Sequence, residues 1–128
     1  WHEAFTAAAH DIQASWPDEG LSEPRQVPWG AFTGEQVLEV YTSELTVHTW
    51  DLARATGQEP DWDPQVVQTS WDAMQFQLPV ADRTAMWEQA RQHLPAGVPW
   101  EDPFANAVEI SDDAPLIDRL AAWNGRTP

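Results

Sequence analysis

The 128-residue chain carries 21 acidic residues against six basic ones, all of them arginine, which gives a formal net charge of −15. This charge argues against a nucleic acid or an anionic membrane as partner, because binding phosphate groups requires a basic face. The absence of cysteine excludes disulfides, thiolate metal ligands and cysteine nucleophiles, and no apolar run approaches the roughly 18 residues of a membrane-spanning helix. We therefore expect a single cytoplasmic globular domain, residues 1–128, with an aromatic core drawn from nine Trp and four Phe.

Apolar residues recur at helical spacing at the start of the chain and predict a first helix from Trp1 to Trp16. His2 and His10 fall beside its apolar stripe, so we expect both at the solvent-facing flank of the helix. The following segment, residues 17–28, is rich in Pro, Gly and acidic residues and predicts an irregular surface connection. Trp29-Gly30 would then allow a tight turn ahead of the next helix.

A central helix is predicted between Thr33 and Gly57. Thr33 and Gln36 have the spacing of a capping box, in which each side chain bonds the backbone N–H of the other residue. Gly57 is the expected stop at the C-terminal end. The positions expected to face the core, spaced three and four residues apart, are Val37, Leu38, Tyr41, Leu45, His48 and Leu52.

Three ionisable side chains, Glu44, His48 and Asp51, lie along or beside this stripe at i, i+4 and i+7. Because burying an unpaired charge is costly, such groups pair with one another, carry protons or bind a cation. Residues four apart on a helix are close enough for Glu44 and His48 to hold one metal ion from successive turns. The alternative is a hydrogen bond between the two within a packed core. Glu-x-x-x-His is a short motif, and a zinc site needs at least one further ligand that this helix does not supply.

Three more helices are predicted after the central one. Asp63-Pro64 has the form of an N-cap followed by a first-turn proline, and Pro79 marks the end of that helix. A thinner apolar stripe predicts a helix over 81–94, residues 95–111 predict a long coil packed on the helices, and residues 113–125 predict a last short helix. The residues expected to face inward are Val66, Val67, Trp71, Met74 and Leu78, then Val98, Trp100, Phe104, Val108 and Ile110 in the coil, and Leu116, Ile117 and Leu120 in the last helix.

Three segments carry a resemblance to a known family: VPWGAFTG at 27–34, ELTVHTWDLARATGQ at 44–58 and DDAPLIDRLAAWNGRTP at 112–128. With them the chain resembles the later two-thirds of proteins of the mycothiol-dependent maleylpyruvate isomerase family, within the DinB-like metal-binding superfamily. The resemblance implies an all-α fold, as a partial DinB-like four-helix bundle with an irregular C-terminal extension. It also implies a divalent metal, commonly zinc, held by three side chains.

By this resemblance Glu44 and His48 would be two of the metal ligands. The third in the family is a His on a helix that precedes everything in the present sequence, and Trp1 is not a translation start, so we expect further helices ahead of this chain. The third ligand is then absent from this chain, or His2 or His10 takes its place. Carboxylate plus imidazole suits zinc, but also nickel, iron or manganese.

The resemblance further implies a mechanism in which the metal lowers the pKa of a low-molecular-weight thiol such as mycothiol, so that the thiolate attacks an electrophilic substrate. On this interpretation Asp51 orients His48 or a bound water, and Arg54 binds a substrate carboxylate. The alternatives are an ion pair of Asp51 with Arg54 or Arg25, and a surface role for Arg54.

Two other function classes stay open. A non-catalytic metal-binding or helical interaction module would keep the central helix but lack converging polar groups around an open metal position. A structural fragment would pair Glu44 with His48 and bind no ion. The partners expected are a small-molecule thiol and an electrophilic substrate, with no nucleic acid and no membrane, and homo-oligomer formation stays open. An incomplete chain could also be inactive.

Overall fold

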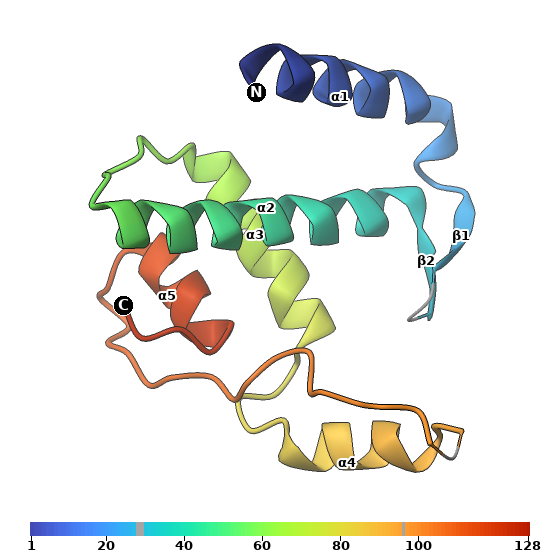
Figure 1. Ribbon diagram of the computed structural model, residues 1–128, viewed down its shortest axis with the longest axis vertical. Coiled ribbons are helices and arrows are strands. Elements are labelled where there is room, and N and C mark those ends of the chain that lie inside the picture. The colour runs from blue at the N-terminus through green and yellow to red at the C-terminus, as the bar shows by residue number, and fades with distance from the viewer. Residues whose placement is uncertain (28–29, 96) are drawn as a thin grey trace. The chain divides into compact units, whose positions relative to one another are not determined.

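The computed structural model describes residues 1–27, 30–95 and 97–128. The chain is mostly helical, as predicted, with one small sheet in addition (Figure 1). Its elements are α1 (His2–Ser15), η1 (Asp18–Gly20), β1 (Pro24–Val27), β2 (Gly30–Thr33), α2 (Gly34–Thr56), α3 (Pro64–Gln77), α4 (Thr84–Gln92) and α5 (Leu116–Trp123). The chain divides into two compact units, Trp1–Glu39 and Val40–Pro128, so the boundary falls within α2. Among the described helices, none is long and apolar enough to cross a membrane.

The first unit holds α1, the hairpin and the start of α2. Helix α1 forms where helical spacing predicted it, and none of its residues is buried. The expected irregular connection is wrong over its last part, because β1 pairs antiparallel with β2, from Pro24 opposite Thr33 to Val27 opposite Gly30. A two-stranded ribbon tolerates a proline at the start of a strand, since that position can lack an N–H donor. The turn expected at Trp29-Gly30 includes Trp29, which lies outside the described residues.

The ends of α2 follow from local chemistry and confirm the prediction. The backbone N–H of Thr33 donates to Gln36 Oε1 (2.9 Å), and the backbone N–H of Gln36 donates to Thr33 Oγ1 (3.2 Å), which is the reciprocal pair of a capping box. At the other end the helix stops before Gly57, whose φ of 66° is left-handed and favours glycine.

The predicted inward face of α2 is wrong over most of its length. Leu45 and Leu52 are 65% and 62% exposed, and Tyr41 and His48 are exposed as well. The side of α2 that is buried within the second unit lies about half a turn away and carries Ser43, Thr46, Val47, Trp50 and Ala53. Apolar residues occur at helical spacing on both sides of this helix, and the rest of the unit covers one of them.

The core of the second unit joins α2, α3 and α5. Its buried centre consists of Val47, Met74, Leu78 and Leu120. Partly buried side chains pack around this centre: Trp71, Met86, Trp87, Phe104, Ile117 and Trp123. Helix α3 packs against α5, and the inward positions predicted for both helices are confirmed except for Val66, which is exposed.

Residues 95–111 form no helix or strand in their described part, as predicted, although Val98 and Ile110 are exposed rather than packed. The fourth helix is shorter than the predicted 81–94, because Asp82 accepts a hydrogen bond from the backbone N–H of Thr84 (3.0 Å) and the chain turns there.

Arg83 anchors the coil to the end of α5. Its guanidinium is fully buried and donates to the carbonyl oxygens of Ala105 and Trp123, and its backbone N–H donates to Asn106 Oδ1 (2.7 Å). Burial lowers the pKa of Arg83 from its ordinary value. A charged side chain can be buried here because two carbonyl oxygens accept from it and its guanidinium lies 5.4 Å from the centre of the Trp123 ring, although Nε has no partner among the described residues.

The N-cap of α3 at Asp63 allows a direct test of how much local capping stabilises the fold. Asp63 Oδ1 accepts from the backbone N–H groups of Gln65 (2.8 Å) and Val66 (3.4 Å), so we expect Asp63→Ala to lower the free energy of unfolding by about 1 kcal/mol. Urea denaturation followed by circular dichroism measures the change. Asp61→Ala is the matched control, since it removes an exposed acid outside the cap. Equal losses in the two variants would contradict a capping role.

Candidate functional site

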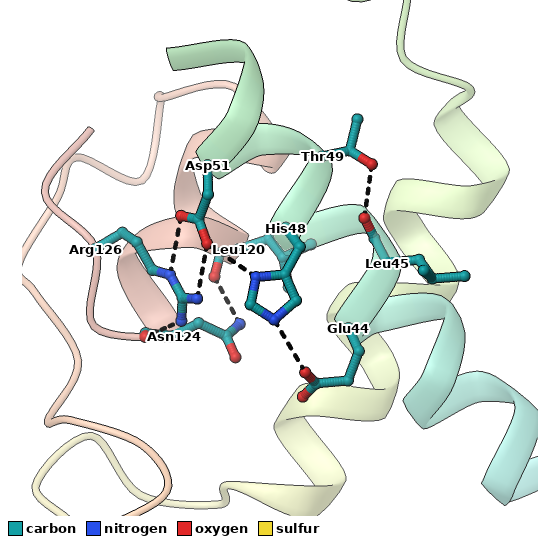
Figure 2. A network of polar contacts seen from close by, with 8 residues as sticks. All are labelled: Glu44, Leu45, His48, Thr49, Asp51, Leu120, Asn124 and Arg126. Atoms are coloured by element: carbon teal, nitrogen blue, oxygen red, sulfur yellow. Dashed lines mark hydrogen bonds and ion pairs between the residues drawn. The ribbon is translucent and has the colours of Figure 1, made fainter. Parts of the chain in front are cut away.

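Glu44, His48 and Asp51 lie together on the uncovered side of α2 (Figure 2). Their side chains are 39%, 64% and 35% exposed, respectively. The inward position predicted for His48 is therefore wrong, because the buried side of the helix is the one that carries Val47 and Trp50. Glu44 and Asp51 are half-buried at the edge of that side, which agrees with their expected place beside the core. The spacing of the three residues nonetheless places them on one strip of the helix, within reach of each other.

The imidazole of His48 lies between two carboxylates. Its Nδ1 is 3.2 Å from Asp51 Oδ2, and its Nε2 is 3.5 Å from Glu44 Oε2. Each ring nitrogen thus faces an oxygen that can only accept a hydrogen bond when ionised. Figure 2 shows the ring of His48 between Asp51 and Glu44, with one ring nitrogen toward each carboxylate.

This arrangement restricts where protons can be. A neutral imidazole has one N–H, and if that proton is on Nδ1 it donates to Asp51 and leaves the Nε2 lone pair facing Glu44. In the other neutral form Nε2–H donates to Glu44 and the Nδ1 lone pair faces Asp51. With the proton on Nδ1, the Nε2 lone pair and Glu44 Oε2 are two acceptors between which a cation could lie.

Arg126, which the sequence analysis did not single out, completes the site. Its Nε donates to Asp51 Oδ1 (3.2 Å) and one terminal nitrogen donates to Asp51 Oδ2 (2.9 Å), which forms a bidentate pair. The other terminal nitrogen donates to the carbonyl oxygen of Asn124 (2.8 Å). The hydrogen bond from Arg126 is the main reason that the pKa of Asp51 lies below its usual value; its charge and His48 act in the same direction, and desolvation opposes them.

The turn after α5 brings Arg126 to this position. The backbone N–H groups of Gly125 and Arg126 donate to the carbonyls of Ala122 and Ala121 (both 3.0 Å), the bond pattern of a Schellman motif. Gly125 has φ of 81°, and a Cβ at this position would lie 2.8 Å from the Cβ of Ala105. The Asn-Gly pair was a recognisable helix stop, but the direction of the residue after it depends on this tertiary packing.

The other predicted site residues do not join this network. Arg54 is exposed and its guanidinium lies 5.5 Å from the centre of the Trp50 ring. Arg25 donates to the Gly20 carbonyl (3.2 Å). Neither is the partner of Asp51 in the structure, so the predicted ion pair of Asp51 with Arg54 or Arg25 is wrong, whereas the surface position of Arg54 agrees with its alternative role.

His2 and His10 are exposed residues of α1 in the first unit. Within the described part of the chain, no three His, Asp or Glu side chains converge in a way that could hold a metal ion by themselves. Glu44 and His48 thus offer two possible metal ligands, and a third ligand from this chain, such as His2 or His10, stays a prediction.

Comparison with known proteins gives relatives but no activity. Two proteins of Mycobacterium tuberculosis, Uncharacterized protein MT0763 (strain CDC 1551 / Oshkosh) and Uncharacterized protein Rv0738 (strain ATCC 25618 / H37Rv), are each 32% identical to the chain over 126 residues. The match covers 98% of the chain and 60% of each relative, so the chain spans about three-fifths of the length of these relatives. No family model and no solved structure matches.

The bidentate pair of Arg126 and Asp51 should contribute measurably to stability. In a double-mutant cycle with Asp51→Asn and Arg126→Gln, we expect a coupling of about 1 kcal/mol in the free energy of unfolding, because the pair is half-buried and bidentate. The matched control is the cycle of Arg91→Gln and Asp102→Asn, whose more exposed pair has a single contact of 2.9 Å; its coupling should be about 0.5 kcal/mol or less. Equal couplings would contradict a stabilising bidentate pair of Arg126 and Asp51.

Proposed function

We propose that the chain binds a divalent metal ion through Glu44 and His48. The observation that carries the proposal is the pair of facing acceptors, Glu44 Oε2 and His48 Nε2, 3.5 Å apart. Two donors bound to one zinc ion at a tetrahedral angle lie roughly 3.4 Å apart. The distance between the two atoms therefore matches that of two ligands of one ion, and the exposure of both side chains leaves coordination positions open for a small molecule.

Asp51 and Arg126 support the same proposal through Nδ1, the ring nitrogen of His48 that does not face Glu44. Metal-bound histidines commonly donate their other ring N–H to a carboxylate, which fixes the ring orientation and the tautomer. Asp51 takes this place at Nδ1, and Arg126 holds Asp51 from the opposite side. Arg126 lowers the pKa of Asp51, and an ionised Asp51 favours the tautomer of His48 that carries its proton on Nδ1 and leaves the Nε2 lone pair available.

We infer that the third ligand comes from outside residues 1–128, with His2 and His10 as alternatives within the chain. The exposed apolar residues Leu45 and Leu52 flank His48 on α2, and such a strip is typical of a surface that another segment covers. The relatives are longer than the matched region, which covers 60% of them. A further helix in the longer protein would cover the strip and complete a DinB-like four-helix bundle.

In that complete protein we propose a thiol-using isomerase or S-transferase. A divalent ion bound at this position would lower the pKa of a low-molecular-weight thiol such as mycothiol, giving a thiolate at neutral pH for attack on an electrophilic small molecule. The residues of the chain have simpler roles: Glu44 and His48 hold the ion, Asp51 orients His48, and Arg126 fixes Asp51. Arg54, exposed at the end of α2, would contact a substrate carboxylate only if the substrate extends that far.

A second candidate is a non-catalytic metal-binding or helical interaction module. The exposure of Leu45 and Leu52 favours it, because a partner helix on that strip would need no chemistry. Turnover of an electrophile that depends on both zinc and added thiol separates the two candidates. We expect such turnover from the protein at the full length of its relatives and none from its His48→Ala variant, and its absence with metal bound would favour the module.

Zinc titration by calorimetry tests the site itself. We expect the chain to bind about one zinc ion per chain, weakly, since two protein ligands are fewer than the usual three or four. His48→Ala and Glu44→Gln should abolish this binding, and Asp51→Asn should weaken it by about 10-fold to 100-fold through loss of the ring orientation.

His93→Ala is the matched control, because His93 is an exposed histidine at the end of α4 whose Nδ1 contacts the carbonyl oxygen of Gln89 (2.9 Å). It should bind zinc as the unmodified chain does. If His48→Ala and His93→Ala bind zinc equally, zinc does not bind at the Glu44–His48 pair and the metal proposal fails.

A further inference from the structure

A hollow in the second unit lies between α3, α5 and the coil of residues 95–111, with a volume of about 340 Å³. It shares no residue with the Glu44, His48, Asp51 and Arg126 site. Its volume falls within the range of small-molecule sites. The residues that line it are Trp71, Gln75, Ala81, Ala107, Val108, Glu109, Ile110, Asp112, Arg119 and Trp123.

Two pairs of residues on facing helices form the walls. Trp71 and Gln75 lie four apart on α3, and Arg119 and Trp123 lie four apart on α5, so each pair shares one face of its helix. The rings of Trp71 and Trp123 meet with centroids 6.1 Å apart at 59°. Arg119 lies over one face of the Trp71 ring and Arg83 over one face of the Trp123 ring, so the wall offers the remaining surface of the two rings to a flat apolar group.

Arg119 brings a positive charge that lacks an anionic partner. Its guanidinium lies 5.0 Å from the centre of the Trp71 ring, and among the described residues no carboxylate oxygen is within 4.0 Å of it. By contrast, Arg91 and Arg126 each pair with an Asp. A half-buried guanidinium stacked on an indole keeps its N–H donors directed for a bidentate carboxylate.

Glu109 and Asp112 bring the opposite charge to the same hollow. Both are exposed and both line it. Because neither pairs with Arg119, the hollow presents one cationic and two anionic groups that are kept apart. A simple carboxylate would satisfy Arg119 and be repelled by the two acids, and a simple amine would do the reverse.

Two buried donors of the wall also lack acceptors. Gln75 Nε2 and Trp123 Nε1 are inaccessible to solvent and have no hydrogen-bond partner among the residues that the structure describes. They lie beneath the surface of the hollow, so a ligand oxygen would reach the Gln75 amide only after its side chain turns. An unsatisfied buried donor is costly, and a ligand oxygen that reached the turned Gln75 amide would remove that cost.

We propose that this hollow binds a small zwitterion with a flat apolar body, in the class of aromatic amino acids. Its carboxylate pairs with Arg119, its ammonium group lies toward Glu109 and Asp112, and its ring lies against Trp71 and Trp123. Charge complementarity selects a molecule that carries both charges, and the aromatic wall selects its body. The proposal is independent of metal binding at Glu44 and His48.

Fluorine NMR with para-fluoro-L-phenylalanine tests the proposal on the intact chain. We expect saturable binding of this amino acid and clearly weaker binding of para-fluorophenylpropionate and para-fluorophenethylamine, each of which lacks one charge. Arg119→Gln should weaken binding of the amino acid by about 10-fold to 100-fold, as expected for loss of a charged hydrogen-bond pair. Asp112→Asn should weaken it by a smaller factor.

Arg91→Gln is the matched control, because it removes an arginine that lies outside the hollow, and its binding should equal that of the unmodified chain. The three-ligand comparison requires no variant, so it decides the matter even if Arg119→Gln fails to fold. The proposal is overturned if the amino acid does not bind saturably, if either single-charge analogue binds as tightly, or if a folded Arg119→Gln binds like Arg91→Gln.

Discussion

Burial of one side of α2 sets the rotation of that helix within the second unit. Val47 packs into the centre with Met74, Leu78 and Leu120, and the Trp50 indole N–H donates to Asp118 on α5 (3.0 Å). With these side chains turned inward, residues about half a turn away must face outward. The packing of Val47 and Trp50 thus places His48 in solvent and Glu44 at the edge of the buried side.

Helix α5 links the core to the candidate site. Leu120 is fully buried in the core, while the turn that ends the same helix directs Arg126 to Asp51. The position of Asp51, and through it the orientation of His48, therefore depends on a contact across 75 positions of sequence. Because the buried Arg83 ties the coil to Trp123 at the end of α5, loss of packing at that end should loosen the His48 ring as well.

Local chemistry allowed both ends of α2 and the start of α3 to be predicted, whereas tertiary packing determined which side of α2 is buried. The Thr33 capping box, the Asp63 cap and the glycine after α2 depend on neighbouring residues, and all three were found as expected. The buried side of α2 was predicted wrongly, because Leu45 and Leu52 recur at helical spacing as Val47 and Trp50 do. Periodicity cannot tell which of two apolar sides the remaining chain covers.

The exposure of His48 also determines how a metal site here would behave. Two donors on one helix, fixed by Asp51 but open to water, bind an ion weakly because few ligands are supplied. A third ligand from another segment would strengthen binding and would bring that segment onto the apolar strip of Leu45 and Leu52. Metal binding and covering of the strip would then stabilise each other. The ion would hold the added segment against α2, and the packed segment would place its ligand at the ion. On the proposed function, the exposure of His48 and the exposure of Leu45 and Leu52 have one cause: the segment that would cover them lies outside residues 1–128.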